Sequence, residues 1–360
     1  MEDYKYLAIV DWVKNYIATE NLKPNDRFLT EMELCSIHNV SRQTVRQAMT
    51  KLESDNIIKR VRGSGTFVSE GIHPAAAVTG TIGVISTYFS DYIFPHIITG
   101  IESVINETAC PIQIAITHNR GIEEAQALSG MLANGVRGLI VEPSKSALPN
   151  MNMALYEKID RNGIPLVFFN AKYEWSSAPC VAMDDTAAGK TVTNYLFDCG
   201  HRDVSGFFVF DNIQGHKRYR GFMESCIAHG KTDAEQNVFW YSAQDSTKMF
   251  GYEKNRILDI LKSSTAVVCF NDMLAVEMLK FCRENGLRVP EDVSVVGIDD
   301  SKYAAVCDVP LTTVHHPHSG LGEAAARALL KQIETPDIEQ HDILFTPELV
   351  IRESVKIINN

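Results

Sequence analysis

Five polar side chains between positions 42 and 47 have the chemistry to read the edges of DNA bases. They are Arg42, Gln43, Thr44, Arg46 and Gln47. Arginine can donate two parallel hydrogen bonds to guanine, and glutamine can pair in a similar way with adenine. The same side chains could equally form the solvated face of an ordinary surface helix, so the neighbouring elements must decide between the two interpretations.

The elements that would position these side chains have the order of a winged helix-turn-helix. Apolar residues at helical spacing predict a first helix, and they are Tyr6, Ile9, Val10, Val13 and Ile17. Thr30 and Glu33 have the spacing of a capping box, which predicts a short second helix that ends near His38. Ser41 can cap a third helix to about Asp55, and the polar side chains fall at its start, where a recognition helix meets the major groove.

A basic hairpin is predicted directly after the third helix. Residues 57–68 suggest two strands around the tip Gly63-Ser64-Gly65, whose small residues let a backbone approach a groove closely. Between Ser41 and Arg62, six basic residues face two acidic ones, a local charge of +4. The net charge of −11 belongs to the chain after residue 70, because the first 70 residues are neutral in sum. Local charge governs phosphate contact, so this segment is suited to double-stranded DNA.

After residue 81 the pattern changes to short apolar strands that alternate with helical stretches. The strands are predicted at residues 81–86, 112–117, 138–142, 166–170, 206–210, 266–270 and 294–298. Continuous apolar strands separated by helices indicate an α/β fold with parallel sheets covered by helices on both faces. The strands form two sets, so the sequence predicts a winged helix-turn-helix in residues 1–69, a linker in residues 70–80 and a two-lobed domain in residues 81–360.

Polar or aromatic residues follow most of these strands. They are Tyr88-Phe89-Ser90-Asp91, Glu142, Asn170, Asn271-Asp272 and Asp299-Asp300. Ligands of open parallel sheets bind beyond the carboxyl ends of the strands. Carboxylates, amides and arginine can form paired hydrogen bonds to sugar hydroxyls, and aromatic rings pack against the apolar faces of sugars. An acidic residue after a strand can instead cap the next helix, and Asp185 and Asp272 are candidates for that role.

Composition and spacing argue against several other classes of protein. Eight cysteines lie far apart without a C-x-x-C pair, so we expect reduced and mostly buried thiols. His315-His316-Pro317-His318 lacks companion ligands at metal spacing and is better explained as a hinge crossing, so no metal or cofactor is expected. The neighbouring carboxylates Asp184-Asp185 and Asp299-Asp300 should point apart, which argues against an enzyme. No apolar run suits a membrane helix or a signal peptide, so we expect a cytoplasmic protein without membrane contact.

Two segments, VSRQTVRQA at residues 40–48 and GSGTFV at residues 63–68, resemble the gluconate-repressor (GntR) family. The resemblance implies DNA contacts from the third helix and from the wing. The predicted DNA-binding residues are Thr30, Ser41, Arg42, Gln43, Thr44, Arg46, Arg62, Ser64 and Gly65. The family often has arginine where this chain has Met32, so one basic contact is missing.

Six further segments resemble the effector domain of the lactose-repressor family, which is itself similar to periplasmic sugar-binding proteins. They are TIGVI (81–85), GVRGLIV (135–141), RYRGF (218–222), CFND (269–272), VPEDVSVVGIDD (289–300) and PLTTV (310–314). The resemblance implies that both lobes contact a sugar, with Phe169 as a ring platform. The predicted sugar-binding residues are Tyr88, Phe89, Asp91, Glu142, Phe169, Asn170, Arg218, Asn271, Asp299 and His316.

The combination of these two parts, with DYIFP at residues 91–95 and VEPSKSA at residues 141–147, resembles the arabinose repressors of Gram-positive bacteria. It implies a homodimeric repressor that binds operator DNA and is released by a monosaccharide, with L-arabinose as the first candidate. The alternatives are another pentose or a hexose as effector, or a cytoplasmic sugar-binding protein without repressor function. A transport or chemotaxis binding protein shares the two-lobed fold, but the basic winged helix argues against it.

Overall fold

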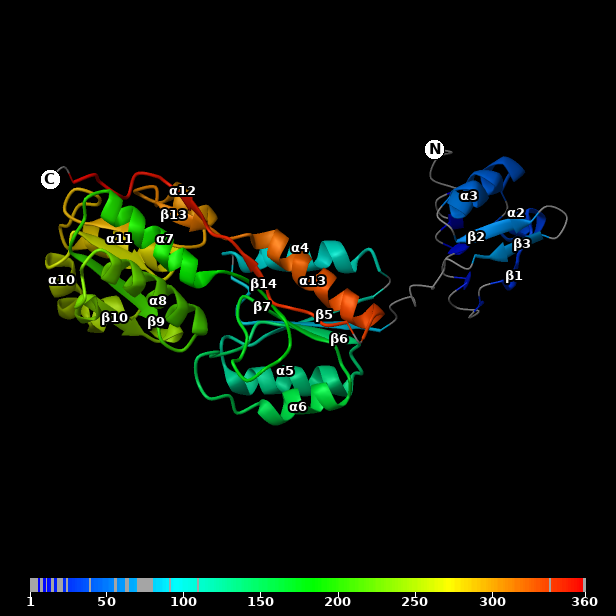
Figure 1. Cartoon of the computed structure of the whole chain (residues 1–360), viewed down its shortest axis with the longest axis horizontal. Helices are drawn as coiled ribbons and strands as arrows, with labels where there is room; N and C mark the ends of the chain where they lie inside the picture. The colour runs from blue at the N-terminus through cyan, green and yellow to red at the C-terminus, as the bar shows by residue number, and fades with distance from the viewer. Residues whose placement is uncertain are drawn as a thin grey trace. The chain divides into compact units, whose positions relative to one another are not determined.

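The computed structural model divides the chain into two compact units, Met1–Thr79 and Gly80–Asn360. It describes residues 6, 9–10, 12–13, 16–17, 22–23, 25–38, 40–54, 57–61, 65–69, 80–90, 92–108, 110–336 and 338–358. Figure 1 shows both units. The predicted linker at residues 70–80 lies outside the described residues, apart from Gly80.

The first unit combines helices with a three-stranded antiparallel sheet in the order β1-β3-β2 (Figure 1). Its elements are β1 (Arg27–Phe28), α2 (Glu31–His38), α3 (Arg42–Ser54), β2 (Ile58–Val61) and β3 (Gly65–Val68). The predicted second and third helices and the hairpin are confirmed, with helix ends within a residue of those predicted. Strand β1 is an addition, because two residues are too few to carry a recognisable alternation.

One apolar core holds the first unit together. Ile9, Val10, Val13 and Ile17 are helical and buried, as the predicted stripe requires. They share this core with the inward faces of the other elements, which contribute Phe28, Leu34, Val45, Ala48, Met49, Leu52, Ile58 and Val68. Because the core takes the apolar face of α3, the polar side chains at the start of that helix are left on the surface.

The first lobe of the second unit is built on a six-stranded parallel sheet in the order β14-β8-β7-β6-β4-β5. Its strands are β4 (Ile82–Ser86), β5 (Ile112–Ile116), β6 (Gly138–Val141), β7 (Leu166–Phe169), β8 (Cys180–Met183) and β14 (Ile343–Phe345). One face of the sheet is covered by α4 (Phe94–Ile105) and α13 (His318–Glu334), and the other by α5 (Gly121–Ala133) and α6 (Met153–Arg161) (Figure 1). Burial on both faces explains the continuous apolar strands.

Two glycines allow α4 and α13 to cross in close contact. A Cβ atom on Gly100 of α4 would lie 2.1 Å from the carbonyl oxygen of Ser319, and one on Gly322 of α13 would lie 2.0 Å from that of Ile97. Such approaches are sterically forbidden, so any larger residue would force the helices apart. This crossing packs an early helix of the second unit against a late one.

The second lobe contains a four-stranded parallel sheet in the order β10-β9-β11-β12. The strands are β9 (Val204–Val209), β10 (Val238–Tyr241), β11 (Ala266–Cys269) and β12 (Ser294–Val296). The helices are α7 (Asp185–Asp198), α8 (Ile213–Ala228), α9 (Met249–Tyr252), α10 (Lys254–Lys262), α11 (Asp272–Glu284) and α12 (Lys302–Val306), with 3₁₀ turns η1 (Ala234–Asn237) and η2 (Ala243–Asp245). An antiparallel pair, β13 (Thr313–His315) and β15 (Glu348–Val350), completes the unit.

The chain passes between the lobes after β8, between β13 and α13, and between β14 and β15. The second passage is residues 316–317, so the chain crosses between the lobes within the predicted segment 315–318. All seven predicted strands are present, and β8, β10, β13, β14 and β15 are additional. Parallel sheets therefore form both lobes, as the α/β pattern predicts.

Six of the eight cysteines are buried, in agreement with the predicted behaviour of small apolar side chains. Among the helices that the structure describes, none is long and apolar enough to cross a lipid bilayer.

Candidate functional site

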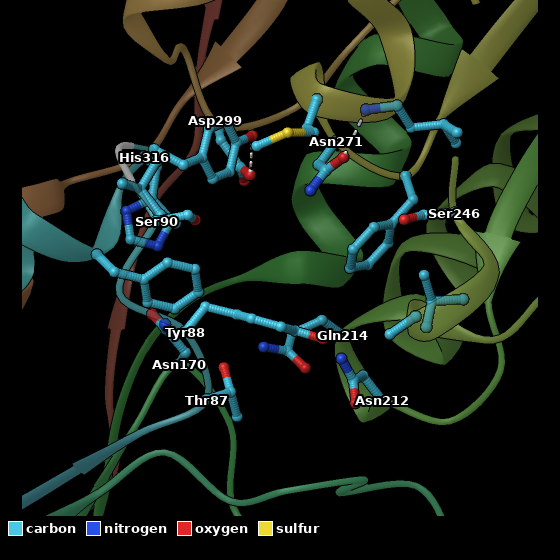
Figure 2. Close-up of a pocket in the computed structure, with 18 of the residues that line it drawn as sticks. Thr87, Tyr88, Ser90, Asn170, Asn212, Gln214, Ser246, Asn271, Asp299 and His316 are labelled. Atoms are coloured by element: carbon cyan, nitrogen blue, oxygen red, sulfur yellow. Dashed lines mark hydrogen bonds between the residues drawn. The ribbon is translucent and has the colours of Figure 1, made fainter. Parts of the chain in front are cut away.

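A cavity of about 320 Å³ lies between the two lobes of the second unit (Figure 2). The first lobe lines it with residues that follow β4, β6 and β7, and the second lobe with residues that follow β9, β11 and β12. Figure 2 shows Asp299, His316 and Ser90 together at one end and Asn212 and Gln214 at the other. Small-molecule sites measure about 300–1,000 Å³, so this cavity suits a ligand as small as a monosaccharide.

Arg218 of α8 is the centre of a buried ion-pair network in this cavity. Its Nε donates to Asp185 Oδ1 at 2.8 Å, and its Nη2 donates to Asp299 Oδ1 at 3.1 Å. The guanidinium carbon lies 4.7 Å from the centre of the Phe270 ring. Both ion pairs are almost completely removed from solvent. The side chain is therefore held in one position before any ligand arrives.

Burial and ion pairing act in opposite directions on these groups. Burial lowers the pKa of the Arg218 guanidinium, but the charges of Asp299 and Asp185 outweigh this effect and raise the pKa above its ordinary value. Burial raises the pKa of the Asp185 and Asp299 carboxyl groups, although Arg218 pulls each pKa down. Arg218 stays charged, and the network supplies one cation shared between two acidic side chains.

The helix caps at two strand ends differ from the prediction. Asp185 does not cap α7, because Asp184 directly before it accepts a 2.9 Å hydrogen bond from the backbone N–H of Ala187. Asp185 is instead committed to Arg218. The two neighbouring carboxylates thus have separate roles and do not form a catalytic pair.

The same exchange occurs at the start of α11. Asn271, predicted as a sugar ligand, caps this helix by accepting a 3.0 Å hydrogen bond from Leu274 N–H. Asp272, the predicted cap, is buried and accepts hydrogen bonds from Ser301 N–H at 2.7 Å and from the hydroxyl of Thr313. Burial, with a contribution from nearby Asp299, raises the pKa of Asp272 to about 8. The cap is the residue directly before the first helical residue. Both α7 and α11 begin one residue earlier than the predicted caps require, so the cap falls on Asp184 and on Asn271.

Asp299 and Asp300 also point in different directions. Asp299 faces the cavity, whereas the Asp300 carboxylate accepts from Arg352 at 2.6 Å and lies 3.2 Å from His315 Nδ1. The paired carboxylates are therefore not arranged as an acid and a base, in line with the sequence argument.

Glu142 and Asn170 form a buried pair in the first-lobe wall of the cavity. Asn170 Nδ2 donates to Glu142 Oε1 at 2.8 Å, and Thr87 N–H donates to Glu142 Oε2 at 2.8 Å. Burial raises the pKa of Glu142, while these hydrogen bonds act to lower it. Asn170 has φ of 60°, a left-handed conformation that asparagine tolerates better than most residues.

His316 is buried at the hinge side of the cavity and accepts a 3.1 Å hydrogen bond from His318 N–H through its Nδ1. Burial, together with neighbouring His318, lowers the pKa of His316 well below its ordinary value, so the ring is neutral. His315, His316 and His318 belong to no group of metal-ligating side chains within the described ranges.

Seven of the ten predicted sugar-binding residues line the cavity. They are Tyr88, Glu142, Asn170, Arg218, Asn271, Asp299 and His316. Phe89 is 56% exposed and Phe169 is completely buried, and neither lines the cavity. Phe169 is the last residue of β7, and a strand residue points to a face of its sheet, whereas Asn170 beyond the strand end reaches the cavity. Asp91 lies outside the described residues.

Several lining residues were not predicted from the sequence. Phe270 provides the aromatic surface that the sequence assigns to Phe169, and Tyr92 donates a 2.6 Å hydrogen bond to Asp299 Oδ2. Gln214 of α8 also lines the cavity, and its Oε1 is buried without a hydrogen-bond partner in the described part of the chain. The polar pair Asp211-Asn212 after β9 carries the same strand-end signal as the predicted residues and could have indicated this wall.

The two lobes also touch at the edge of the cavity near Asn212. Asn119 Nδ2 donates to Asn212 Oδ1 at 3.2 Å, and Ile213 N–H donates to Ser146 Oγ at 2.9 Å. Ala147 N–H donates to the backbone carbonyl of Asp211 at 3.3 Å. These contacts close one side of the cavity.

The candidate DNA-binding residues of the first unit start with a capping box at α2. Thr30 N–H donates to Glu33 Oε2 at 2.7 Å, and Glu33 N–H donates to Thr30 Oγ1 at 3.3 Å. The backbone hydrogen bond from Thr30 lowers the pKa of Glu33. Met32, in the first turn of this helix, is 65% exposed, so an apolar side chain stands where the GntR family often has a basic one.

Ser41 caps α3 by accepting a 3.3 Å hydrogen bond from Thr44 N–H. Arg42, Gln43 and Arg46 are exposed in the first turns of the helix. Arg46 Nε donates to Glu31 Oε2 of α2 at 3.2 Å, and the Arg46 side chain is 69% exposed. The first turns of α3 therefore present the side chains that the sequence assigns to base reading.

The wing is the hairpin of β2 and β3. Gly65 begins β3 with φ of 121°, a conformation that favours glycine. Arg62 and Ser64, the other predicted wing contacts, lie outside the described residues. Arg60 on β2 pairs with Glu53 at 3.0 Å and with Glu31 at 3.4 Å, so these ion pairs connect the wing to both α2 and α3.

Two known families match different parts of the chain. Residues 5–68 match the family described as bacterial regulatory proteins, gntR family. Residues 193–355 match the periplasmic binding protein-like domain.

Two relatives are similar over nearly their full length. The arabinose metabolism transcriptional repressor of Geobacillus stearothermophilus is 38% identical over 355 residues, which cover 98% of this chain and 98% of the relative. The protein of the same name in Halalkalibacterium halodurans is 37% identical, with 97% and 96% covered. Among solved structures, the ribose-bound LacI-family regulator of Enterococcus faecium superposes with a TM-score of 0.66 at 22% identity, covering 78% of this chain and 100% of that one. This last similarity concerns the fold.

Proposed function

Because the chain belongs to the family of arabinose metabolism transcriptional repressors and is a sugar-responsive repressor, not an enzyme, we propose that L-arabinose is its inducer. The observation that carries the proposal is the Arg218 network. It supplies a charged, immobile donor between two carboxylates and beside the Phe270 ring, in a cavity of monosaccharide size. Paired polar groups and an aromatic face are the chemistry by which proteins hold sugars.

The charge of the cavity supports a neutral ligand. Among the described lining residues, Arg218 is the one permanent cation, and Asp185 and Asp299 already balance it. His316 is neutral, and Glu142 adds a further buried acidic group. A phosphorylated sugar would bring a dianion into this acidic surrounding without a free cation to meet it. A free sugar is therefore favoured over a sugar phosphate.

Sugar contacts are proposed for the lining residues of both lobes. From the first lobe these are Tyr88 and Asn170, and from the second lobe Arg218, Asn271, Asp299 and His316. Gln214 joins them, because a buried acceptor without a partner is costly until a ligand hydroxyl donates to it. Another pentose or a hexose remains the second candidate class, since all of these groups recognise hydroxyls in general.

Operator contacts are proposed for the exposed start of α3 and for the wing. Arg42, Gln43 and Arg46 would read base edges, whereas Thr30, Ser41 and Thr44 position the helix ends and Gly65 allows the wing to approach the backbone. The exposed side chains of Arg42, Gln43 and Arg46 and the match of residues 5–68 to the gntR family support the assignment.

The proposed mechanism couples the two sites through a homodimer in the cytoplasm. A sugar that contacts both lobes stabilises their closed arrangement, and closure changes the contacts between the two copies of the chain. The two winged helices then no longer match the half-site spacing of the operator. By linkage, operator DNA weakens sugar binding by the same factor.

Fluorescence anisotropy tests the proposal with an operator selected from random palindromic DNA. The expected result is a tight complex that L-arabinose dissociates, while D-arabinose and D-xylose at equal concentration do not. Unchanged operator affinity at saturating L-arabinose, with release by another sugar, would transfer the proposal to that sugar. Release by none of a panel of pentoses and hexoses contradicts it altogether.

A further inference from the structure

Glu142 is a buried carboxylate whose oxygens are already occupied by the protein. Its side chain lies at the end of β6 and is only 4% exposed. Oε2 accepts from Thr87 N–H at 2.8 Å, from the Thr87 hydroxyl, and from Ser86 Oγ at 3.3 Å. Oε1 accepts from Asn170 Nδ2 at 2.8 Å. The donors are divided unequally, because Oε2 accepts three hydrogen bonds and Oε1 accepts one, from the Asn170 amide.

This arrangement decides which end of the Asn170 amide faces the cavity. A carboxylate can only accept, so the amide must turn its NH₂ group toward Glu142. The other end, Oδ1, is then left buried without a hydrogen-bond partner among the described residues. Asn170 lines the cavity and is 7% exposed, and Figure 2 shows it beside Tyr88 and Thr87 on the first-lobe side. Asn170 therefore offers the cavity an oxygen that can only accept a hydrogen bond.

We propose that Glu142 is a positioning residue, not a direct sugar ligand, and that it selects inducers by holding the Asn170 amide with its oxygen toward the sugar. The inference rests on the proposed function, because it concerns the same cavity. It predicts that one ring hydroxyl of the inducer must donate a hydrogen bond to Asn170 Oδ1. Fluorine accepts weakly and cannot donate, so an analogue with fluorine at that hydroxyl should be rejected.

Replacing Glu142 by glutamine inverts this polarity. In E142Q the donors of Thr87 and Ser86 still require an acceptor, so the oxygen of the introduced amide takes their side and its NH₂ turns to Asn170. Asn170 must then rotate its oxygen toward the introduced amide and its NH₂ toward the cavity. In the original protein, a fluorinated sugar leaves Asn170 Oδ1 buried without a donor, which weakens sugar binding about tenfold or more. In E142Q the NH₂ group of Asn170 faces the sugar instead, so this penalty for fluorine should disappear.

A second exchange restores the original polarity. In N170D the introduced carboxylate faces that of Glu142, and the variant should bind the sugar poorly. In the double variant E142Q/N170D, the amide at position 142 donates to one oxygen of the carboxylate at position 170 and leaves the other toward the cavity as an acceptor. Aspartate also tolerates the left-handed backbone at this position. The double variant should reject the fluorinated sugar as the original protein does.

The experiment measures the affinities of the deoxyfluoro analogues of L-arabinose by calorimetry for the full-length protein and these three variants. We expect one fluorinated position whose penalty is about tenfold or more in the original protein, absent in E142Q and restored in E142Q/N170D. The same pattern of penalties in the original protein and in E142Q, with all variants folded, overturns the inference. Failure of the original protein to bind L-arabinose at all contradicts the proposed function instead.

Glu124 provides a matched control for the Glu142 exchange. It is a completely buried carboxylate in the same lobe, and it accepts from Ser144 N–H at 2.6 Å and from the hydroxyls of Tyr156 and Tyr173. It does not line the cavity. E124Q should lower stability without changing which fluorinated position is penalised. If E142Q fails to fold, the contrast between N170D and E142Q/N170D still tests the inference, because only correct amide pairing predicts the rescue.

Discussion

The hydroxyl of Tyr92 donates a 2.6 Å hydrogen bond to Asp299 Oδ2, and this bond joins the two lobes across the cavity. The other carboxylate oxygen of Asp299 accepts a hydrogen bond from Arg218, so one carboxylate takes part in both the lobe contact and the Arg218 network. Burial and the charge of Asp299 raise the pKa of Tyr92 well above its ordinary value, which keeps the hydroxyl a donor. Closure of the lobes and preparation of the sugar site are thus linked through two side chains.

Replacing Tyr92 by phenylalanine should therefore weaken both stability and sugar binding. The lost bond leaves a buried carboxylate oxygen without its donor, at an expected cost of about 1–3 kcal/mol in the free energy of unfolding. Urea denaturation and sugar calorimetry measure the two effects. Tyr156→Phe removes a similar buried hydroxyl, which donates a 3.0 Å hydrogen bond to Glu124. Neither residue lines the cavity. Tyr156→Phe should lower stability alone, and equal losses of sugar affinity in both variants would argue against the linkage.

Arg218→Met should abolish induction. The substitution leaves Asp185 and Asp299 buried without their cation, and the removal of one partner of a buried ion pair costs about 3–5 kcal/mol. The second unit loses stability, and the repressor stays on its operator when L-arabinose is added. Anisotropy with and without sugar measures this, and normal release of the variant by sugar would remove Arg218 from the proposed site.

Asp272 should make stability fall as the pH rises. Burial raises its folded-state pKa to about 8, above the ordinary value of about 4, so the folded protein binds the proton more tightly than the unfolded chain. This contribution is complete below about pH 4 and is lost between about pH 4 and pH 8. Asp272→Asn should flatten the dependence in that window, as measured by urea denaturation across pH.

Asp292 gives the opposite sign and serves as the comparison. The hydrogen bond from Arg288 lowers its pKa to about 2, so its contribution is present above about pH 4 and is lost as the pH falls toward 2. Asp292→Asn should alter the acid limb alone. Identical pH profiles for Asp272→Asn and the original protein would count against the assigned role of Asp272.

Arg46→Ala should reduce operator affinity and leave sugar affinity unchanged. A base contact from arginine is worth about 1–3 kcal/mol, equivalent to roughly five- to 150-fold in Kd. Arg288, whose side chain is 70% exposed in the second unit, offers a control for the loss of one positive charge. Anisotropy with operator DNA should separate Arg46→Ala from Arg288→Ala. If both substitutions weaken the complex equally, the effect is one of general charge.

Gly100→Ala should destabilise the second unit through the crossing of α4 and α13. Its methyl group would meet the Ser319 carbonyl at 2.1 Å, and overpacking of this kind costs about 1–3 kcal/mol or more. Gly130 of α5 has no described atom within 4 Å of the position that a methyl group would take, so Gly130→Ala should stabilise its helix by about 0.5–1 kcal/mol. Thermal denaturation of the two variants should show melting temperatures displaced in opposite directions.

Elements with local signals could be recognised from the amino-acid sequence alone. The capping box of Thr30 and Glu33, the apolar stripe of α3 and the glycine-tipped hairpin each depend on residues close together in the chain, so their pattern survives without knowledge of the fold. The same holds for the buried parallel strands, and strand ends such as Glu142, Asn170 and Asp299 could be assigned to the cavity because parallel strands place their carboxyl ends on one edge.

The division of roles among the side chains at these strand ends depends on the tertiary fold. Asp185 faces Arg218 while Asp184 caps α7, because the helix begins one residue earlier than a cap at Asp185 would require, and a local pattern does not specify a helix end to one residue. Phe270, and not Phe169, flanks the guanidinium, since the choice depends on which ring projects beyond its sheet. The bond from Tyr92 to Asp299 joins residues 207 positions apart. Such pairings depend on how the two lobes pack against each other, and local spacing in the sequence does not determine that packing.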